Sequence, residues 1–262
     1  MYGKLLNNES IAYFKRHEPI GCRDEVTAEK LQERGVNAYF SSCLTTTLGY
    51  KYRSDKKSDK IYVVDAVHYI PESQRRLQKY KFLIQYLLHF RGINKFLKSI
   101  RENNNYAVDL SNRNYNRFCR IVRSYMIVKQ LLKPEDMKHV EVLTQFHYAE
   151  EVPTNEERFK RAEELLKKYS EARLVITSRI HTALPCTGLE TPVIFLQNMD
   201  DSEESICRFK GLIELLNVVQ FKKNAIIQSP YGMPIKVDEV KTLKTYRLYA
   251  DKLIDKCTNF FK

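Results

Sequence analysis

The stretch RLVITSRIHTALP, residues 173–185, joins a continuous apolar run to a group of polar residues. Its run LVIT is typical of a strand that is buried on both faces of a parallel sheet. Ser178, Arg179 and His181 follow directly at the carboxyl end of this predicted strand. A helix is predicted from Thr182 onward. Because ligands of open α/β sheets bind at this end, beside the free amides of helix N-termini, the stretch predicts both a fold class and a binding site.

Apolar runs and amphipathic segments alternate along most of the chain, which is typical of a parallel sheet with helices on both faces. Strands are predicted at residues 19–22, 36–44, 61–66, 140–148, 173–178 and 192–197. Helices are predicted at residues 23–35, 154–172, 182–190 and 203–216, and from residue 241 onward. Asp24 is the predicted N-cap of the first of these helices and Gly35 its stop, and Thr154 with Glu157 forms a predicted capping box. The predicted fold class is therefore α/β.

The polar segment at residues 51–60 is the predicted linker between two domains, residues 1–50 and 51–262. The second domain contains a basic helical excursion at about residues 71–134. Asparagines interrupt this excursion at residues 101–116, and we expect that part to be exposed.

The net charge of +12, from 44 basic and 32 acidic residues, favours an anionic partner. Acidic residues are interleaved with the basic ones along the predicted helices, so nucleic acid is not the predicted partner. The six cysteines lack the spacing of a zinc or redox site, and the N-terminus lacks the apolar core of a secretory signal. These features predict a cytoplasmic protein without a metal or other cofactor.

The basic helix predicted at about residues 79–98 has two interpretations. It can rest on an anionic membrane surface, or it can pack against the core with a solvated rim. Its longest apolar stretch, FLIQYLLHF at residues 82–90, is too short to span a bilayer.

A second strand end resembles the one at Arg179. The run PIGC is followed by Arg23 and then by a predicted helix, so two arginines can hold one dianionic ligand from opposite sides of a cleft. Three alternatives stay open: Arg23 can pair with Asp24 or a nearby glutamate, His181 can merely cap its helix, and His147 on a third strand can be structural. For MDDSEES at residues 199–205, an acidic helix start is favoured over a metal site.

Two blocks around these arginines resemble the polysaccharide pyruvyl transferase family. Residues 19–49 contain a Gly-x-Arg-Asp turn, a helix and a Ser-x-Cys-Leu-Thr-x-Thr-Leu strand. Residues 172–196 contain a Ser-Arg-x-His signature, an Ala/Leu-rich helix and a Thr-Pro-Val strand. The resemblance implies two Rossmann-like lobes similar to the GT-B glycosyltransferases. Only about twenty residues precede the Gly-x-Arg-Asp turn, so we expect the N-terminal lobe to be incomplete.

The resemblance also implies an activity, namely transfer of a pyruvyl group from phosphoenolpyruvate to a pair of sugar hydroxyls as a ketal. The acceptor would be a cell-surface polysaccharide (capsule or exopolysaccharide) or its precursor, a saccharide or lipid-linked saccharide, which implies a place at the inner face of the plasma membrane. Arg23 and Arg179 would bind phosphoenolpyruvate with Ser178 beside them, and His181 would be catalytic. Two other functions stay open: a glycosyltransferase that uses a nucleotide sugar, and an inactive binding subunit of a polysaccharide assembly complex.

Overall fold

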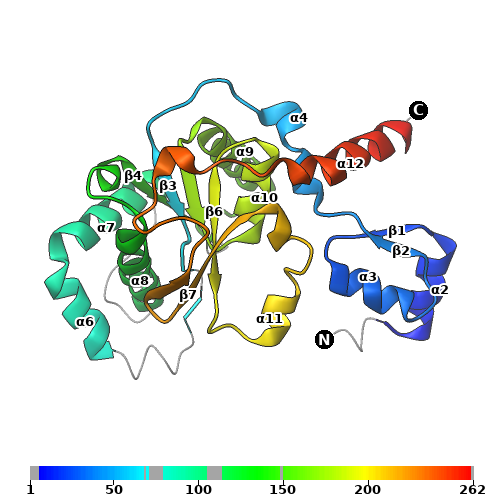
Figure 1. Cartoon of the computed structure of the whole chain (residues 1–262), viewed down its shortest axis with the longest axis horizontal. Helices are drawn as coiled ribbons and strands as arrows, with labels where there is room; N and C mark the ends of the chain where they lie inside the picture. Colours follow the sequence, from blue (N-terminus) through cyan, green and yellow to red (C-terminus); the bar gives the residue numbers. More distant parts are fainter. Residues whose placement is uncertain (1–5, 68, 71–78, 105–113, 148–149, 261–262) are drawn as a thin grey trace.

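The computed structural model of the chain describes residues 6–67, 69–70, 79–104, 114–147 and 150–260. Its main sheet has the strand order β4-β3-β5-β6-β7-β8 (Figure 1). The strands are β3 (Ile61–Val64), β4 (Val140–Leu143), β5 (Leu174–Thr177), β6 (Val193–Asn198), β7 (Asn217–Lys222) and β8 (Ala225–Gln228). Each neighbouring pair is parallel except β7 with β8. The fold is thus mixed α/β with a mainly parallel sheet, as the sequence predicted.

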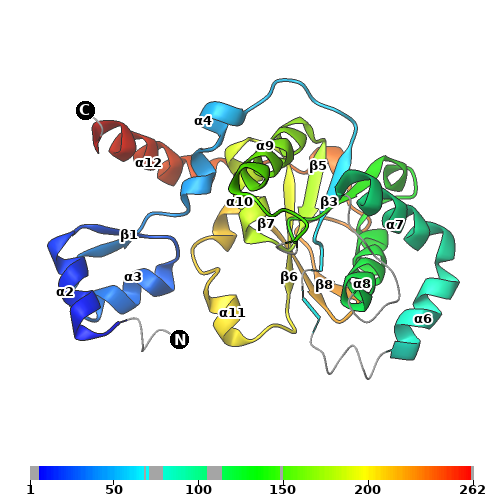
Figure 2. The same ribbon diagram turned by 180° about the vertical axis from the view of Figure 1, so that it is seen from behind.

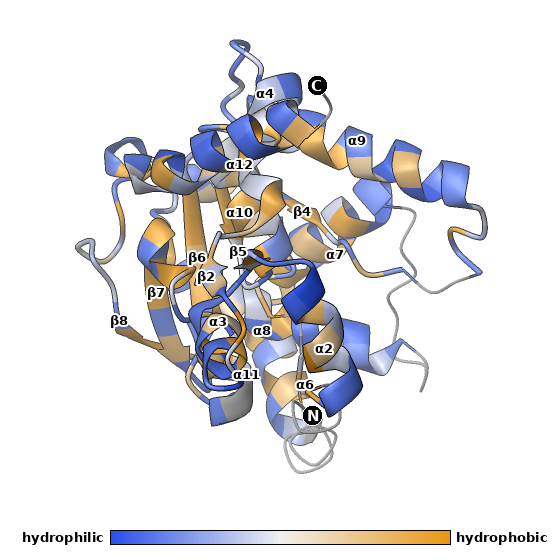
Figure 3. Ribbon diagram, turned by 90° about the vertical axis from the view of Figure 1, so that its right-hand side faces the viewer, coloured by the Kyte–Doolittle hydropathy of each residue, from blue (hydrophilic) through white to orange (hydrophobic). Residues whose placement is uncertain are grey.

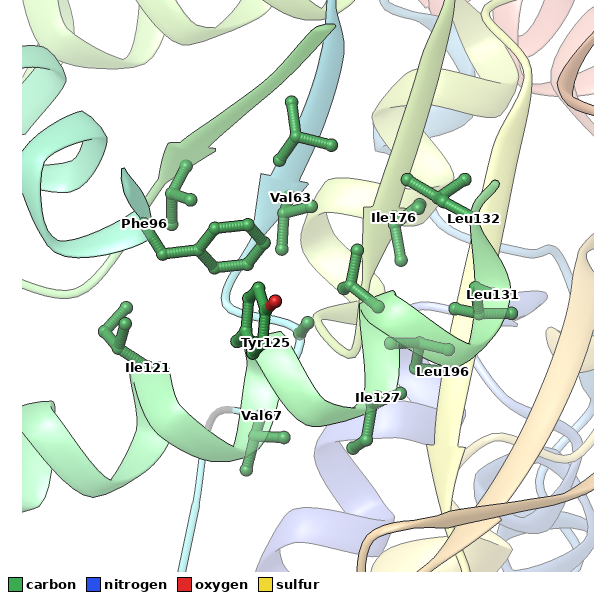
Figure 4. Packing of buried hydrophobic residues seen from close by; sticks show 14 of the residues in the cluster. Val63, Val67, Phe96, Ile121, Tyr125, Ile127, Leu131, Leu132, Ile176 and Leu196 are labelled. Atoms are coloured by element: carbon green, nitrogen blue, oxygen red, sulfur yellow. The ribbon is translucent and has the colours of Figure 1, made fainter. Parts of the chain in front are cut away.

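Helices cover both faces of this sheet. On one face, α7 (Phe90–Asn104) and α8 (Tyr115–Leu131) pack against side chains such as Val63 and Ile176, and Figure 4 shows this contact. On the other face, α9 (Asn155–Glu171) and α10 (Ile180–Gly188) pack against the intervening side chains. In Figure 3, β6 and β7 are coloured mainly in the orange of hydrophobic residues, and the helices around them alternate between blue and orange. The strands are buried from two sides, which explains their unbroken aliphatic runs.

The predicted basic excursion contains α6 (Lys79–Leu88), α7 and α8. The predicted exposure of residues 101–116 is wrong at Asn114, the buried N-cap of α8, and at Asn104, which is buried at the end of α7. Its amide donates to the carbonyls of Ile100 at 2.9 Å and Val142 at 3.3 Å. Asparagine there satisfies backbone groups between a helix and a strand, a role that composition alone does not reveal. Residues 71–78 and 105–113 of the predicted excursion lie outside the described residues.

A small unit forms the N-terminal part of the chain, with α2 (Asn8–Arg16), β1 (Ile20–Cys22), α3 (Glu25–Gln32) and β2 (Ala38–Phe40). β1 and β2 are parallel, and Figure 2 shows this unit beside α12 and α11. The predicted cap is confirmed, because the Asp24 carboxylate accepts from the Thr27 amide at 2.9 Å. The predicted stop is also confirmed, since Gly35 has a φ of 70°, which favours glycine.

The predicted strand at residues 36–44 ends early, at Phe40, and so does the Ser-x-Cys-Leu-Thr-x-Thr-Leu strand implied by the resemblance. The threonines instead form a 3₁₀ helix, η1 (Leu44–Thr47), followed by α4 (Gly49–Tyr52). This segment packs closely on α10, because a Cβ atom at Gly188 would lie 2.4 Å from the Thr46 carbonyl oxygen. The backbone contact with α10 overrides the strand propensity of threonine.

The C-terminal part differs from its prediction in two places. The helix predicted at residues 203–216 is two short helices, α11 (Glu203–Cys207) and η3 (Ile213–Leu215). β7 and β8 follow and were not predicted; the residues of β8 are mostly exposed, so it lacks a clear apolar pattern. The chain continues through η4 (Val237–Glu239) and η5 (Lys244–Tyr246) to α12 (Arg247–Phe260), while η2 (Asp136–His139) precedes β4. The capping box at Thr154 and Glu157 is present.

Candidate active site

The register of the sheet brings three strand ends to one place. Val64 of β3 pairs with Leu143 of β4 on one side and with Thr177 of β5 on the other. Because these strands are parallel, the residues that follow them leave the sheet at the same edge. Asp65 and Ser178 meet there: the Ser178 hydroxyl donates to the Asp65 carbonyl at 2.7 Å. The predicted site residue Ser178 is therefore buried and holds the loop after β3.

The Asp65 carboxylate organises this edge. It accepts from the Thr144 hydroxyl at 2.6 Å and from the Gln145 amide at 3.0 Å. Its third donor is Arg179 Nε at 3.3 Å, which gives an ion pair with a nearly buried carboxylate. Asp65 has a φ of 43°, a conformation that aspartate tolerates better than most residues. Asp65 thereby fixes the direction in which the Arg179 guanidinium points.

Arg23 reaches the same region from the N-terminal unit. It follows β1 and stands directly before α3, whose Glu25 amide donates to the carbonyl of Lys210 at 3.3 Å. Arg23 Nη2 lies 3.8 Å from the carboxylate of Asp24, so the predicted alternative pairing does form. Its Nε is buried and has no hydrogen-bond partner among the described residues. Arg23 is thus only partly satisfied by its neighbour.

Arg23, Ser178, Arg179 and His181 line one cavity of about 630 Å³. Two further arginines, Arg120 and Arg208, also line this cavity. Among the described residues, Asp201 is the one carboxylate that lines it. Ile180 and His181, the first residues of α10, also face the cavity, and helix N-termini favour anions. The structure brings the four predicted site residues together around a strongly cationic space.

His181 is exposed at the start of α10 and contacts the loop that follows the N-terminal unit. Burial of the Cys43 thiol raises its pKa, but hydrogen bonds with His181 and Thr45 outweigh this effect and bring the pKa to about 7. The Thr45 hydroxyl donates to Cys43 Sγ at 3.2 Å. His181 therefore touches a thiol on one side and the cationic cavity on the other.

A second cavity of about 590 Å³ adjoins the first, because Gln145 and His181 line both. Its wall is largely apolar. Residues of η1, α9 and α10, such as Leu165 and Pro185, form this wall together with Leu48, which lies between η1 and α4. Arg158 and Arg161 of α9 add positive charge to this wall. His181 stands where the cationic and the apolar cavities meet.

The other candidates are His147 and the acidic segment at residues 199–205. His147 lines the second cavity, and burial together with the nearby charge of Arg161 lowers its pKa. Within residues 199–205, Asp200 pairs with Arg123 at 3.2 Å, and Asp201 accepts from Asn198 at 2.7 Å. The described residues contain no group of three or more His, Cys, Asp or Glu side chains that could hold a metal ion.

Three residues of the site were missed in the sequence. Asp65 ends the run IYVVD, so the strand-end rule that singled out Arg179 would have found it. Arg120 lies between Arg117 and Arg123, and this three-residue spacing along an otherwise apolar helix was a usable signal. Arg208 follows α11 and carried no comparable signal.

Comparison with known proteins gives one family. The family model described as polysaccharide pyruvyl transferase matches residues 4–201, which include the N-terminal unit and both arginine-bearing strand ends. No curated protein and no solved structure matches the chain.

Proposed function

The chain belongs to the polysaccharide pyruvyl transferase family, and from this premise we propose that it transfers a pyruvyl group from phosphoenolpyruvate to two hydroxyls of a saccharide. The observation that supports the donor is the shared cavity of Arg23 and Arg179. Phosphoenolpyruvate carries a carboxylate and a phosphate, and guanidinium groups bind both in bidentate fashion. Arg120 and Arg208 add the charge that a trianionic ligand requires.

In this proposal the two cavities take the two substrates. Phosphoenolpyruvate occupies the cationic cavity, and the saccharide, free or lipid-linked, enters from the adjoining apolar one. His181 then lies between donor and acceptor, where a proton must move. Imidazole is the side chain that most often serves as general acid or base in enzymes, which suits a reaction with several proton transfers.

The proposed reaction balances with the two substrates alone. His181 gives a proton to C3 of the enol while an acceptor hydroxyl oxygen bonds to C2, and the proton of that hydroxyl then replaces the one that His181 gave. The C2–O bond to phosphate then breaks as the second hydroxyl oxygen bonds to C2, which closes the ketal. Phosphate leaves with the second proton. Arginines around the phosphate stabilise the charge that develops on the leaving group.

The proposal extends to the surroundings of the reaction. We propose that the product is part of a cell-surface polysaccharide or its precursor. The proposed location of the protein is the cytoplasm, at the inner face of the membrane. The proposed arrangement of the two units is similar to that of the GT-B glycosyltransferases. The domains proposed are residues 1–50, as a Rossmann-like N-terminal lobe, and residues 51–262, as a second Rossmann-like lobe.

The experiment measures phosphate release from phosphoenolpyruvate with lipid-linked or nitrophenyl sugars as acceptors. Arg179→Ala and His181→Ala should each lower the rate at least about a hundredfold, since each removes a group that contacts a reacting substrate. Arg16→Ala at the end of α2 and His17→Ala at its C-cap are matched controls, because both side chains are exposed and outside the cavities. Thermal stabilisation by nucleotide sugars but not by phosphoenolpyruvate would contradict the proposal and favour a glycosyltransferase. Binding of phosphoenolpyruvate without turnover would favour an inactive binding subunit.

A further inference from the structure

One helix of the protein turns an apolar face to solvent. α6 buries Phe82, and its Tyr86 packs edge-on against Phe118 of α8 with the ring centres 5.4 Å apart. The opposite side of α6 is also apolar: its large side chains are 44 to 79% exposed, and these are Tyr80, Leu83, Ile84, Leu87 and Leu88. Their spacing of three and four residues makes one continuous stripe. α6 thus packs against the core through one side and exposes apolar side chains on the other.

The exposed stripe, defined as these five residues together with Phe90, needs a partner. Phe90 begins α7 and is 51% exposed, so it extends the stripe beyond the end of α6. Exposed apolar residues are common singly, whereas a contiguous group of six marks an interaction surface.

Charge around the stripe selects the partner. Residues 79–95 contain four basic residues and no acidic one; they are Lys79, Lys81, Arg91 and Lys95. Further along α7, Lys98 pairs with Glu102 at 3.7 Å. A second copy of the chain that docked through the same face would bring these cations opposite one another, because a twofold interface pairs a patch with itself. Anionic lipid headgroups complement the cations instead, and acyl chains accept the apolar side chains.

The position of the stripe fits this partner. Figures 1 and 2 show α6 at the edge of the molecule, at the same end of the sheet as α11. Ser205 of α11 lines the cationic cavity. No helix in the described ranges is long and apolar enough to cross a bilayer, so contact through a surface helix is the mode that the structure offers.

We propose that the exposed stripe on α6 and the basic residues beside it dock the protein on an anionic membrane surface. The apolar side chains enter the boundary between headgroups and acyl chains, while Lys81 and Arg91 meet the lipid phosphates. Docking by α6 brings the end of the sheet that carries the cavity toward the membrane. A lipid-linked acceptor would then be presented to the site at the surface where it resides.

The test is sedimentation of the full chain with vesicles, without phosphoenolpyruvate or acceptor, so its result is independent of the proposed pyruvyl transfer. Vesicles of phosphatidylcholine alone are compared with vesicles that also contain phosphatidylglycerol. We expect binding to the anionic vesicles that weakens as salt is added. Leu83→Glu/Leu87→Glu should weaken that binding about tenfold or more, and Lys81→Gln/Arg91→Gln should weaken binding to anionic vesicles only.

Leu248→Glu is the matched control, since Leu248 on α12 is 66% exposed but lies outside the stripe. This variant should bind vesicles as the wild type does. Equal binding by the wild type and Leu83→Glu/Leu87→Glu, with both folded by thermal unfolding, would overturn the proposal. A wild-type dimer in light scattering that Leu83→Glu/Leu87→Glu converts to a monomer, without vesicle binding by either, would overturn it in favour of a second copy.

Discussion

Gly188→Ala should destabilise the protein although it replaces a helical glycine by the best helix former. Gly188 is the last residue of α10 and faces the backbone of η1. A Cβ atom there would lie 2.4 Å from the Thr46 carbonyl oxygen and 2.7 Å from its carbonyl carbon. Ordinary van der Waals contact begins at 3.4 Å, so η1 and α10 must separate by about 1 Å.

The size of the effect follows from two opposing contributions. Overpacking of this kind costs about 1–3 kcal/mol, because backbone cannot move aside as a flexible side chain can. The higher helix propensity of alanine stabilises the folded protein by at most about 1 kcal/mol relative to glycine. The expected net loss is about 1–2 kcal/mol, which lowers the melting temperature by about 2–8 °C for a chain of this size.

Differential scanning calorimetry measures this loss, with Gly232→Ala as the control. Gly232 is exposed, and a Cβ atom there would have no heavy atom within 4 Å, so its melting temperature should stay unchanged. A second readout is the thiol of Cys43, whose pKa should rise from about 7 as η1 moves away from His181. A melting temperature of Gly188→Ala at or above that of the wild type would show that the backbones of η1 and α10 are not in close contact at Gly188.

Three further predictions concern single side chains. Asp65→Asn should weaken phosphoenolpyruvate binding about tenfold, because Arg179 loses a charged partner worth about 1–2 kcal/mol. Isothermal titration calorimetry measures this affinity, and an unchanged value would show that Asp65 does not position Arg179. Cys43 keeps 9% of its surface exposed, so iodoacetamide should alkylate it with a midpoint near pH 7. Cys186 is completely buried and its pKa is raised, so it should stay unreactive. Mass spectrometry across pH decides, and a midpoint near 9 for Cys43 would contradict its hydrogen bond to His181. Hydrogen bonds, above all that from Lys244, lower the pKa of Glu190 to about 2, so its contribution to stability is complete above pH 4.5 and is lost as the pH falls through 2. The side chain of Lys244 is 63% exposed and that of Arg247 47%, so solvent screens these ion pairs. Glu190→Gln should therefore cost about 1 kcal/mol of unfolding free energy at pH 6 and nearly nothing at pH 2, and a cost independent of pH would be inconsistent with this pairing.

The parts of the fold that followed from sequence are those set by local signals. The unbroken aliphatic run of β5 identified a buried parallel strand, and Asp24 and Gly35 marked the ends of α3 through capping and a positive φ. Where the local signal is missing, the prediction failed. α10 begins at Ile180, two residues before the predicted Thr182. Its N-cap, Arg179, is not a residue type preferred at that position and makes no side-chain cap hydrogen bond, so no capping signal marked the start of the helix.

The site divides in the same way. Two arginines at two strand ends were visible as a repeated pattern, and the structure places both on one cavity. That Asp65 holds one of them depends on the register of β3 against β5, which pairs residues more than a hundred positions apart. The roles of Arg23, Arg179, Ser178 and His181 stay predictions that follow from this geometry.

In the proposed function, Arg23 and Arg179 bind the same phosphoenolpyruvate molecule. This arrangement can be tested by a double-mutant cycle in isothermal titration calorimetry, with Arg23→Gln, Arg179→Gln and their combination. Each single change should weaken binding about tenfold to a hundredfold, as expected for loss of a charged hydrogen bond to the ligand. A dissociation constant for phosphoenolpyruvate that neither substitution changes would contradict it.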